Sequence, residues 1–175
     1  MPIKNNVTRL LDSRKIEYET LEYDAAEFHS AAQVAAMIGV PIAQVYKTIV
    51  ALREDAHAGR KPLLVIVAAD REIDRRRLAA SLGEKNLKVA KHAEAEALTG
   101  LQVGGISALA LLNKPFEVCI DRPALALSHV FISAGQRGLN VKIGVQDLIN
   151  LTKAKVVDAT WPYTSPTDRR EHGQK

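Results

Sequence analysis

Short aliphatic segments of strand length recur along this chain, and helical segments separate them without strict alternation. Val45–Leu52, Leu63–Ala69 and Glu117–Asp121 are rich in the aliphatic and β-branched residues that favour strands. Because the predicted strands outnumber the helices and do not alternate with them one by one, the pattern indicates a mixed sheet rather than a doubly wound parallel sheet. The predicted fold class is α/β, with a mixed sheet surrounded by helices.

Helices are predicted where capping residues flank helical spacing. Ser30 and Gly39 flank one such segment, and Asp74 and Gly83 flank another. Apolar spacing predicts further helices at residues 7–11, 93–98 and 145–151. The remaining predicted strands lie at residues 17–23, 87–90, 106–112, 130–133, 141–143 and 156–157.

The chain of 175 residues is long enough for one hydrophobic core and short for two. Aromatic residues make up only 5% of it, so the core must be built mainly from aliphatic side chains. We expect a single domain over residues 1–160. We expect a flexible tail over residues 161–175, because the segment after Trp161-Pro162 has almost no apolar side chains to offset the entropy of ordering.

Composition also limits the classes of protein to which the chain could belong. A single cysteine, Cys119, excludes an intramolecular disulfide and a thiolate zinc site. The sequence has neither the apolar run of a signal peptide at its start nor the roughly 18 apolar residues of a membrane span, so we expect a cytoplasmic protein without membrane contact. The net charge of +4 suits a polyanionic partner, but inert domains carry similar charges.

Lys47 is the most informative single residue. It lies in an otherwise apolar strand and shares a face with Val45, Ile49 and Ala51, because side chains alternate along a strand. A lysine in this setting extends to solvent at a sheet edge, meets an anion, or faces a cavity. The pattern leaves two readings open, an ordinary edge-strand lysine and a cation in a pocket for phosphate, carboxylate or a reacting carbonyl.

Two glycine-containing segments are the other candidates. Gly104-Gly105 precedes Ile106-Ser107 and would allow another group to approach the backbone closely. The segment Ser133–Gly138 combines a hydroxyl, two glycines and an arginine, and such a turn can direct N–H groups and a guanidinium at an anion. An ordinary bulge and an ordinary hairpin remain alternatives for these segments.

Other reactive residue types give weak signals. Cys119 lies between Val118 and Ile120 without a histidine nearby, which favours a buried, inert thiol. The five histidines show no spacing typical of metal ligands, so no metal site is predicted.

Taken in order, these segments resemble the YbaK-type aminoacyl-tRNA deacylases, also called Cys-tRNA(Pro) deacylases. The resemblance extends over residues 5–158, and its motifs are weak singly but specific together. The matching segments are Gln44–Thr48, Thr99-Gly100, Val103–Ser107, Ser133–Leu139 and Gln146–Leu148.

The resemblance implies a single, partly barrel-like α/β domain that takes aminoacyl-tRNA as substrate, with prolyl-tRNA synthetase as a further partner. It also implies that Lys47 is the catalytic residue, which orients the substrate. The residues implied to bind the substrate are Tyr23, Thr48, Gly104, Gly105, Ile106, Ser107, Ser133 and Arg137. In cysteine-specific members the substrate's own thiol attacks its ester carbonyl, so the resemblance implies no enzyme nucleophile, metal or cofactor.

The chain departs from the family pattern in two segments. Ala108–Ala110 stands where members commonly have proline and glycine, and Gln136 replaces the usual lysine of the glycine turn. These departures leave open a deacylase for alanine or another small amino acid. A non-catalytic module that binds tRNA and a purely structural domain are the remaining alternatives, and the presence of Lys47 with both glycine segments argues against them.

Overall fold

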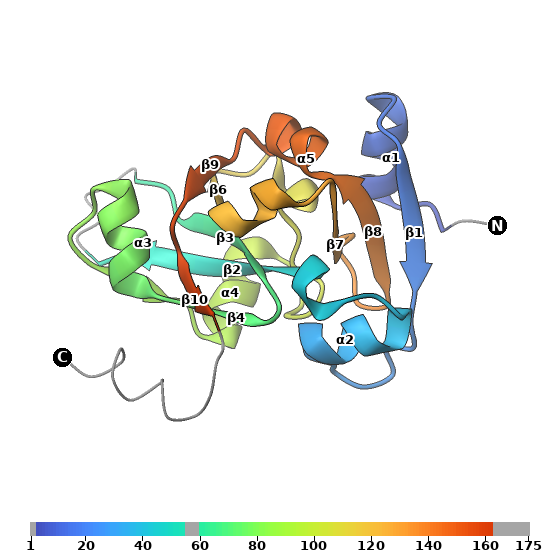
Figure 1. Cartoon of the computed structure of the whole chain (residues 1–175), viewed down its shortest axis with the longest axis horizontal. Coiled ribbons are helices and arrows are strands. Elements are labelled where there is room, and N and C mark those ends of the chain that lie inside the picture. The colour runs from blue at the N-terminus through green and yellow to red at the C-terminus, as the bar shows by residue number, and fades with distance from the viewer. Residues whose placement is uncertain (1–2, 55–59, 163–175) are drawn as a thin grey trace.

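The protein is described here by a computed structural model that covers residues 3–54 and 60–162 (Figure 1). The predicted boundary at residue 160 falls inside strand β10 (Thr160–Pro162), which pairs with β4 (Arg71–Ile73). The first two residues of the predicted tail are therefore part of a strand. Residues 163–175 lie outside the described part of the chain.

A five-stranded mixed sheet forms the larger half of the domain. Its order is β5 (Leu87–Val89), β2 (Tyr46–Arg53), β3 (Leu63–Ala68), β6 (Glu117–Asp121) and β9 (Lys155–Val157). The strands β5, β2 and β3 pair antiparallel, whereas β3–β6 and β6–β9 pair parallel. The prediction of a mixed sheet is therefore confirmed.

A second, three-stranded antiparallel sheet lies beside it, in the order β1 (Tyr18–Glu22), β8 (Leu139–Gly144) and β7 (His129–Ser133). A parallel bridge between Val45 and Phe131 connects β7 to the start of β2. The strands thus form connected sheets that curve around a core without closing into a barrel (Figure 1).

The main core lies between these two sheets. Leu64 and Ile66 of β3 contribute to it from one side, and Val141 and Ile143 of β8 from the other. Alternate residues of β3, such as Val65, point to the opposite face and pack under helix α3 (Arg75–Leu82). All six residues of β3 are buried, which explains its continuous aliphatic sequence.

Helix α2 (Ala31–Ile38) covers the outer face of the three-stranded sheet, where Ala35 packs with Val45 and Phe131. The predicted helix boundaries are confirmed at both capped helices. Ser30 forms a capping box with Gln33, Asp74 caps α3, and Gly39 and Gly83 end the two helices in the left-handed conformation. The remaining helices are α1 (Asn6–Ser13), α4 (His92–Thr99) and α5 (Val145–Thr152).

The prediction of a strand at residues 106–112 is wrong. This segment holds a 3₁₀ helix, η2 (Ala108–Leu111), whose start is capped by the Ser107 hydroxyl through the N–H of Leu109. Ala108, Leu109 and Leu111 are all buried, so apolar side chains occupy successive positions and not only one face of this segment. A short run of this kind lacks the periodicity that distinguishes a strand from a helical turn.

Two further 3₁₀ helices are η1 (Ile42–Gln44), between α2 and β2, and η3 (Arg122–Ala126), between β6 and β7. In the described part of the chain, no helix is long and apolar enough to cross a membrane.

Candidate functional site

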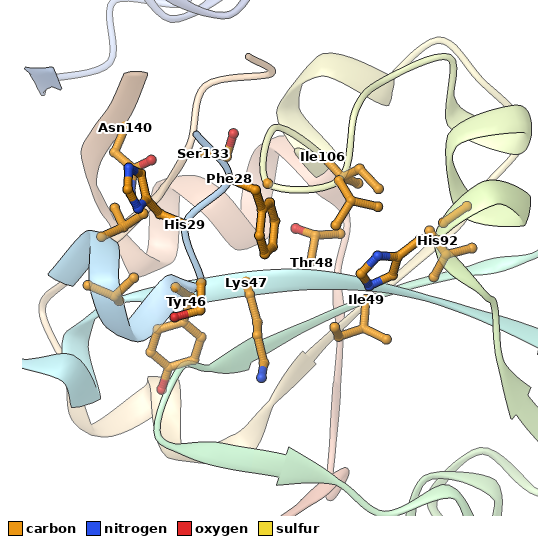
Figure 2. Close-up of a pocket in the computed structure, with 18 of the residues that line it drawn as sticks. Phe28, His29, Tyr46, Lys47, Thr48, Ile49, His92, Ile106, Ser133 and Asn140 are labelled. Atoms are coloured by element: carbon orange, nitrogen blue, oxygen red, sulfur yellow. The ribbon is translucent and has the colours of Figure 1, made fainter. Parts of the chain in front are cut away.

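A pocket of about 320 Å³ opens where β2, α2, α4 and the three-stranded sheet meet (Figure 2). Its volume is at the lower end of the range typical of small-molecule sites, about 300–1,000 Å³. The walls are mainly apolar, with a few polar groups among them. The lining includes Tyr23, Phe28, His29, Val34, Val45, Tyr46, Lys47, Thr48, Ile49, His92, Gly104, Ile106, Ser133 and Asn140.

The pocket borders an open edge of β2 at Thr48. The Val45 carbonyl accepts the Ala69 N–H, while the Val50 carbonyl points the other way and accepts the Ala90 N–H. Because hydrogen-bonding directions alternate along an antiparallel strand, the backbone groups of Thr48 point away from β3 like those of Val50. Strand β5 covers only Ala51–Arg53, so the Thr48 N–H and C=O are presented toward the pocket.

Lys47 lines the same pocket from the other side of the strand. In Figure 2 the Thr48 side chain and the Phe28 ring lie on one side of β2, and the Lys47 ammonium extends to the other. Burial lowers the pKa of this ammonium below its ordinary value, and the negative charges of Glu72 and Asp70 act in the opposite direction. In the described part of the chain, the Lys47 Nζ forms no direct hydrogen bond or ion pair, so it can still bind an anionic or carbonyl oxygen.

The Gly104-Gly105 segment packs against the glycine turn of residues 133–138. A Cβ atom on Gly105 would lie 2.9 Å from the Arg137 backbone nitrogen and 3.0 Å from the Gln136 backbone. Only glycine permits this approach. The group that comes close to the Gly104-Gly105 backbone is the glycine turn of residues 133–138. Gly104, at φ +93°, completes the segment in a conformation that other residues rarely adopt.

The rim of the pocket carries an exposed aromatic side chain. Phe28 is 50% exposed, and the Arg137 guanidinium lies over its ring at 5.3 Å from the centroid. The Arg137 Nε donates a hydrogen bond to the Val103 carbonyl at 2.7 Å, which fixes the guanidinium beside the glycine segment. The ring of His92, at the start of α4, lies 6.5 Å from that of Phe28. The rim therefore joins residues from three distant segments of the sequence.

The wall formed by the three-stranded sheet is polar. Ser133 of β7 and Asn140 of β8 are directly opposite each other in the strand pairing, and both line the pocket. Sequence reasoning did not select Asn140 or His92, whereas Phe28 and His29 were candidates for an aromatic side chain that some family members use. For Asn140 a signal exists, because its neighbours Leu139 and Val141 face the core and the intervening position must therefore face the same side as Ser133.

The structure brings six of the residues implied to form the site together around the pocket, namely Tyr23, Lys47, Thr48, Gly104, Ile106 and Ser133. The others are not in its lining. Ser107 is 1% exposed and its hydroxyl caps η2, while Gly105 supports the glycine turn. Arg137 lies at the rim over Phe28 and lines a neighbouring hollow with Gln136.

Cys119 lies outside the pocket. It is 1% exposed within the core layer under α3, and burial raises the pKa of its thiol to about 11. The expectation of a buried thiol is therefore confirmed, and a thiol with this pKa is almost entirely protonated near neutral pH. Within residues 3–54 and 60–162, no cluster of three or more His, Cys, Asp or Glu side chains is arranged to hold a metal ion.

The sequence matches a family model and several known proteins. A family model described as the aminoacyl-tRNA editing domain matches residues 25–151. An Enterococcus faecalis protein named "Putative Cys-tRNA(Pro)/Cys-tRNA(Cys) deacylase EbsC" is 28% identical over 160 residues, which cover 90% of this chain and 93% of that protein. A proline–tRNA ligase of Lactobacillus delbrueckii subsp. bulgaricus is 27% identical over 109 residues, which are 61% of this chain and 18% of the ligase.

Among solved structures, one titled "Crystal structure of a putative trans-editing enzyme for prolyl tRNA synthetase" superposes with a TM-score of 0.72 and 22% identity. The match covers 91% of this chain and 99% of that one. At this identity the likeness establishes a shared fold.

Proposed function

The chain belongs to the aminoacyl-tRNA editing domain family, and from this membership we propose that it is a trans-editing hydrolase that removes misattached cysteine from tRNA(Pro). The observation that carries the proposal is the convergence of segments distant in sequence on one pocket. Lys47 and Thr48, Gly104 and Ser133 all line it. The names of the Enterococcus faecalis relative and of the matched ligase support the choice of cysteine and of tRNA(Pro).

The size and lining of the pocket suit an aminoacyl ester. An ester is already activated, so that holding its carbonyl in position and polarising it supply most of the catalysis required. The open edge of β2 offers the Thr48 N–H as a donor to the carbonyl, and the glycine segment lies across from it. The Lys47 ammonium extends from the other side of β2, and we assign to it the role of the cation that binds the negative charge developing on the ester or the neighbouring ribose oxygens.

In the proposed reaction the nucleophile belongs to the substrate. The cysteine thiol loses its proton and attacks its own ester carbonyl, the bond from that carbonyl to the ribose oxygen breaks, and the ribose oxygen takes up a proton. The products are free tRNA and a thiolactone, which water opens to cysteine. This route is compatible with the buried, protonated state of Cys119, because it requires no thiol from the protein.

The choice of cysteine is tested by comparing Cys-tRNA(Pro) and Ser-tRNA(Pro). The two substrates differ by one atom, and pocket shape alone discriminates about 10–200-fold for so small a change. The thiol is partly ionised near neutral pH and the hydroxyl is not, so we expect a much larger preference for Cys-tRNA and release of a thiolactone or of cysteine formed from it. Equal rates on the two substrates would indicate an attacking water and a deacylase of broader specificity.

The role of Lys47 is tested with Lys47→Ala. We expect loss of deacylation with the fold retained, because an ammonium at a pocket edge contributes little to the core. Lys142→Ala, at a half-buried lysine of β8 outside the pocket, is the matched control. Hydrolysis of Cys-tRNA by Lys47→Ala at the rate of the unmodified protein would contradict the assignment. As part of the same proposal, we place the protein in the cytoplasm with prolyl-tRNA synthetase, where tRNA(Pro) is charged.

A further inference from the structure

Asn140 presents a buried amide to the pocket. It is 4% exposed and lies on β8, the central strand of the three-stranded sheet, between Leu21 of β1 and Ser133 of β7. In the described part of the chain, its carboxamide forms no hydrogen bond with another residue. Asn140 is one of the most buried of the polar residues that line the pocket.

The amide oxygen and nitrogen reach the cavity, because neither is among the described side-chain atoms that are fully buried without a partner. A ligand that fills the cavity displaces water from this amide, and leaving the carboxamide unpaired would then cost about 1–3 kcal/mol. Leu21 on one side offers no polar atom, and the Ser133 hydroxyl on the other side accepts the Gly135 N–H. The amide therefore faces the cavity, and its hydrogen-bond partner is a molecule that enters the cavity.

The position of Asn140 indicates which part of a ligand it meets. Phe28 and His92 are exposed at the rim, and the open edge of β2 lies between the rim and the sheet wall. An aminoacyl ester whose carbonyl lies at Thr48 therefore directs its side chain toward the buried wall. That wall carries the Ser133 hydroxyl and the Asn140 carboxamide, and none of the described aspartates and glutamates lines the pocket.

We propose that Asn140 is a specificity-determining residue that hydrogen bonds the polar end of the amino-acid side chain, a thiol or a hydroxyl. The inference rests on the proposed deacylase function and names the class of amino acid that this site accepts. The amide oxygen accepts the S–H or O–H, and the amide nitrogen donates to the same sulfur or oxygen. Alanine lacks the polar atom, so it leaves the amide without a partner in the filled pocket and is disfavoured.

Asn140→Leu tests this role, because leucine keeps the number and branching of the side-chain heavy atoms and removes both hydrogen-bonding atoms. We measure kcat/KM for Cys-tRNA, Ser-tRNA and Ala-tRNA of one acceptor. For Asn140→Leu we expect a fall of about 10-fold or more on the cysteinyl and seryl substrates and no fall on the alanyl substrate. Asn150→Leu, at an exposed position of α5, is the matched control and should change none of the three.

An equal fall on all three substrates would overturn the proposal, because it would show that Asn140 holds a part that all aminoacyl groups share. If Asn140→Leu does not fold, Asn140→Ala answers the same question, since it also removes both polar atoms without adding bulk to the wall. Thermal unfolding of each variant separates a folding defect from a change in specificity.

Affinity measurements with substrate analogues that cannot be hydrolysed distinguish this inference from the proposed function. The probes are 3′-aminoacylamino-3′-deoxyadenosines, whose amide bond cannot be cleaved as the ester is, carrying cysteine, serine or alanine. We expect the unmodified protein to bind the cysteinyl and seryl probes more tightly than the alanyl probe, and Asn140→Leu to bind all three alike. Binding with this preference but without hydrolysis of any aminoacyl-tRNA would contradict the deacylase function alone. Equal affinity of the unmodified protein for the three probes would overturn the role of Asn140.

Discussion

Arg137 and Phe28 form a cation–π contact at the rim of the pocket, with the guanidinium carbon 5.3 Å from the ring centroid. The contact joins the glycine turn to the segment before α2, and the Arg137 Nε also binds the Val103 carbonyl. A planar guanidinium is required for both contacts at once, because it stacks with its face and donates with its edge.

Arg137→Lys keeps the charge and removes the planar group, so we expect the rim to loosen. The predicted effect is a fall of about 5- to 10-fold in kcat/KM for Cys-tRNA, on the order of 1 kcal/mol, mostly through a higher KM. Arg9→Lys, at an exposed position of α1, is the control. An unchanged kcat/KM for Arg137→Lys would show that the guanidinium contributes charge alone.

Gly105→Ala should disturb the site more than its size suggests. The added Cβ would lie 2.9 Å from the Arg137 backbone nitrogen, and backbone atoms cannot move aside as the end of a side chain can. We expect a stability loss of about 1–3 kcal/mol together with reduced deacylation, measured by thermal unfolding and by kcat/KM. Gly144→Ala is the control, because its added Cβ would lie 3.1 Å from the Asp147 carboxylate, the end of a side chain, and 3.9 Å from the Ser128 carbonyl, an ordinary contact. Equal effects of the two substitutions would contradict the account of the glycine segment.

The pKa of Lys47 should lie below its ordinary value of 10.5 and should depend on Glu72. Burial favours the neutral amine, and the Glu72 charge favours the ammonium, so Glu72→Gln should lower this pKa further. The cation is present below the pKa and is lost as the pH rises through it, so the activity that depends on it should end at a lower pH in Glu72→Gln.

Titration of 13C-labelled lysine by NMR measures the pKa of Lys47 directly. Glu17→Gln, on the exposed surface, should leave it unchanged. A pKa that does not move in Glu72→Gln would contradict the coupling.

Cys119→Ser should keep its activity and lose stability. The thiol lies in the layer under α3, outside the pocket, and burying a hydroxyl there without a partner costs about 1–3 kcal/mol. The free energy of unfolding and the rate on Cys-tRNA measure the two effects separately. Complete loss of turnover in a folded Cys119→Ser protein that still binds substrate would contradict the substrate-assisted mechanism.

The sequence predicted the elements of this fold better than their assembly. Caps and periodicity located α2 and α3, because Ser30 and Asp74 act on N–H groups only three residues away. The division of the strands into separate sheets depends on contacts such as the bridge between Val45 and Phe131, which are 86 positions apart and leave no local pattern.

The site shows the same limit. Lys47 was conspicuous because it interrupts an apolar strand, but the direction of its ammonium, toward Glu72 and Asp70, depends on the tertiary placement of β4. Ser107 was implied to bind substrate, and in the structure its hydroxyl caps η2. Asn140 lies just before the strand predicted at residues 141–143, and its place in the pocket wall depends on the pairing of β8 with β7, which sets it opposite Ser133.

Binding of tRNA should depend strongly on salt, while the chemical step should not. Phosphate contacts release counterions, so affinity for a nucleic acid falls steeply as the salt concentration rises, and a chain with a net charge of +4 is suited to such contacts. In the proposed complex the ester would lie in a largely apolar pocket, where mobile ions would screen its interactions little. We therefore expect KM for Cys-tRNA to rise between low and moderate ionic strength and kcat to remain constant.

A minimal substrate, cysteinyl adenosine, is the control and should show a nearly constant KM. A constant KM for the full Cys-tRNA would show that the basic charge is incidental and that a partner protein recruits the tRNA.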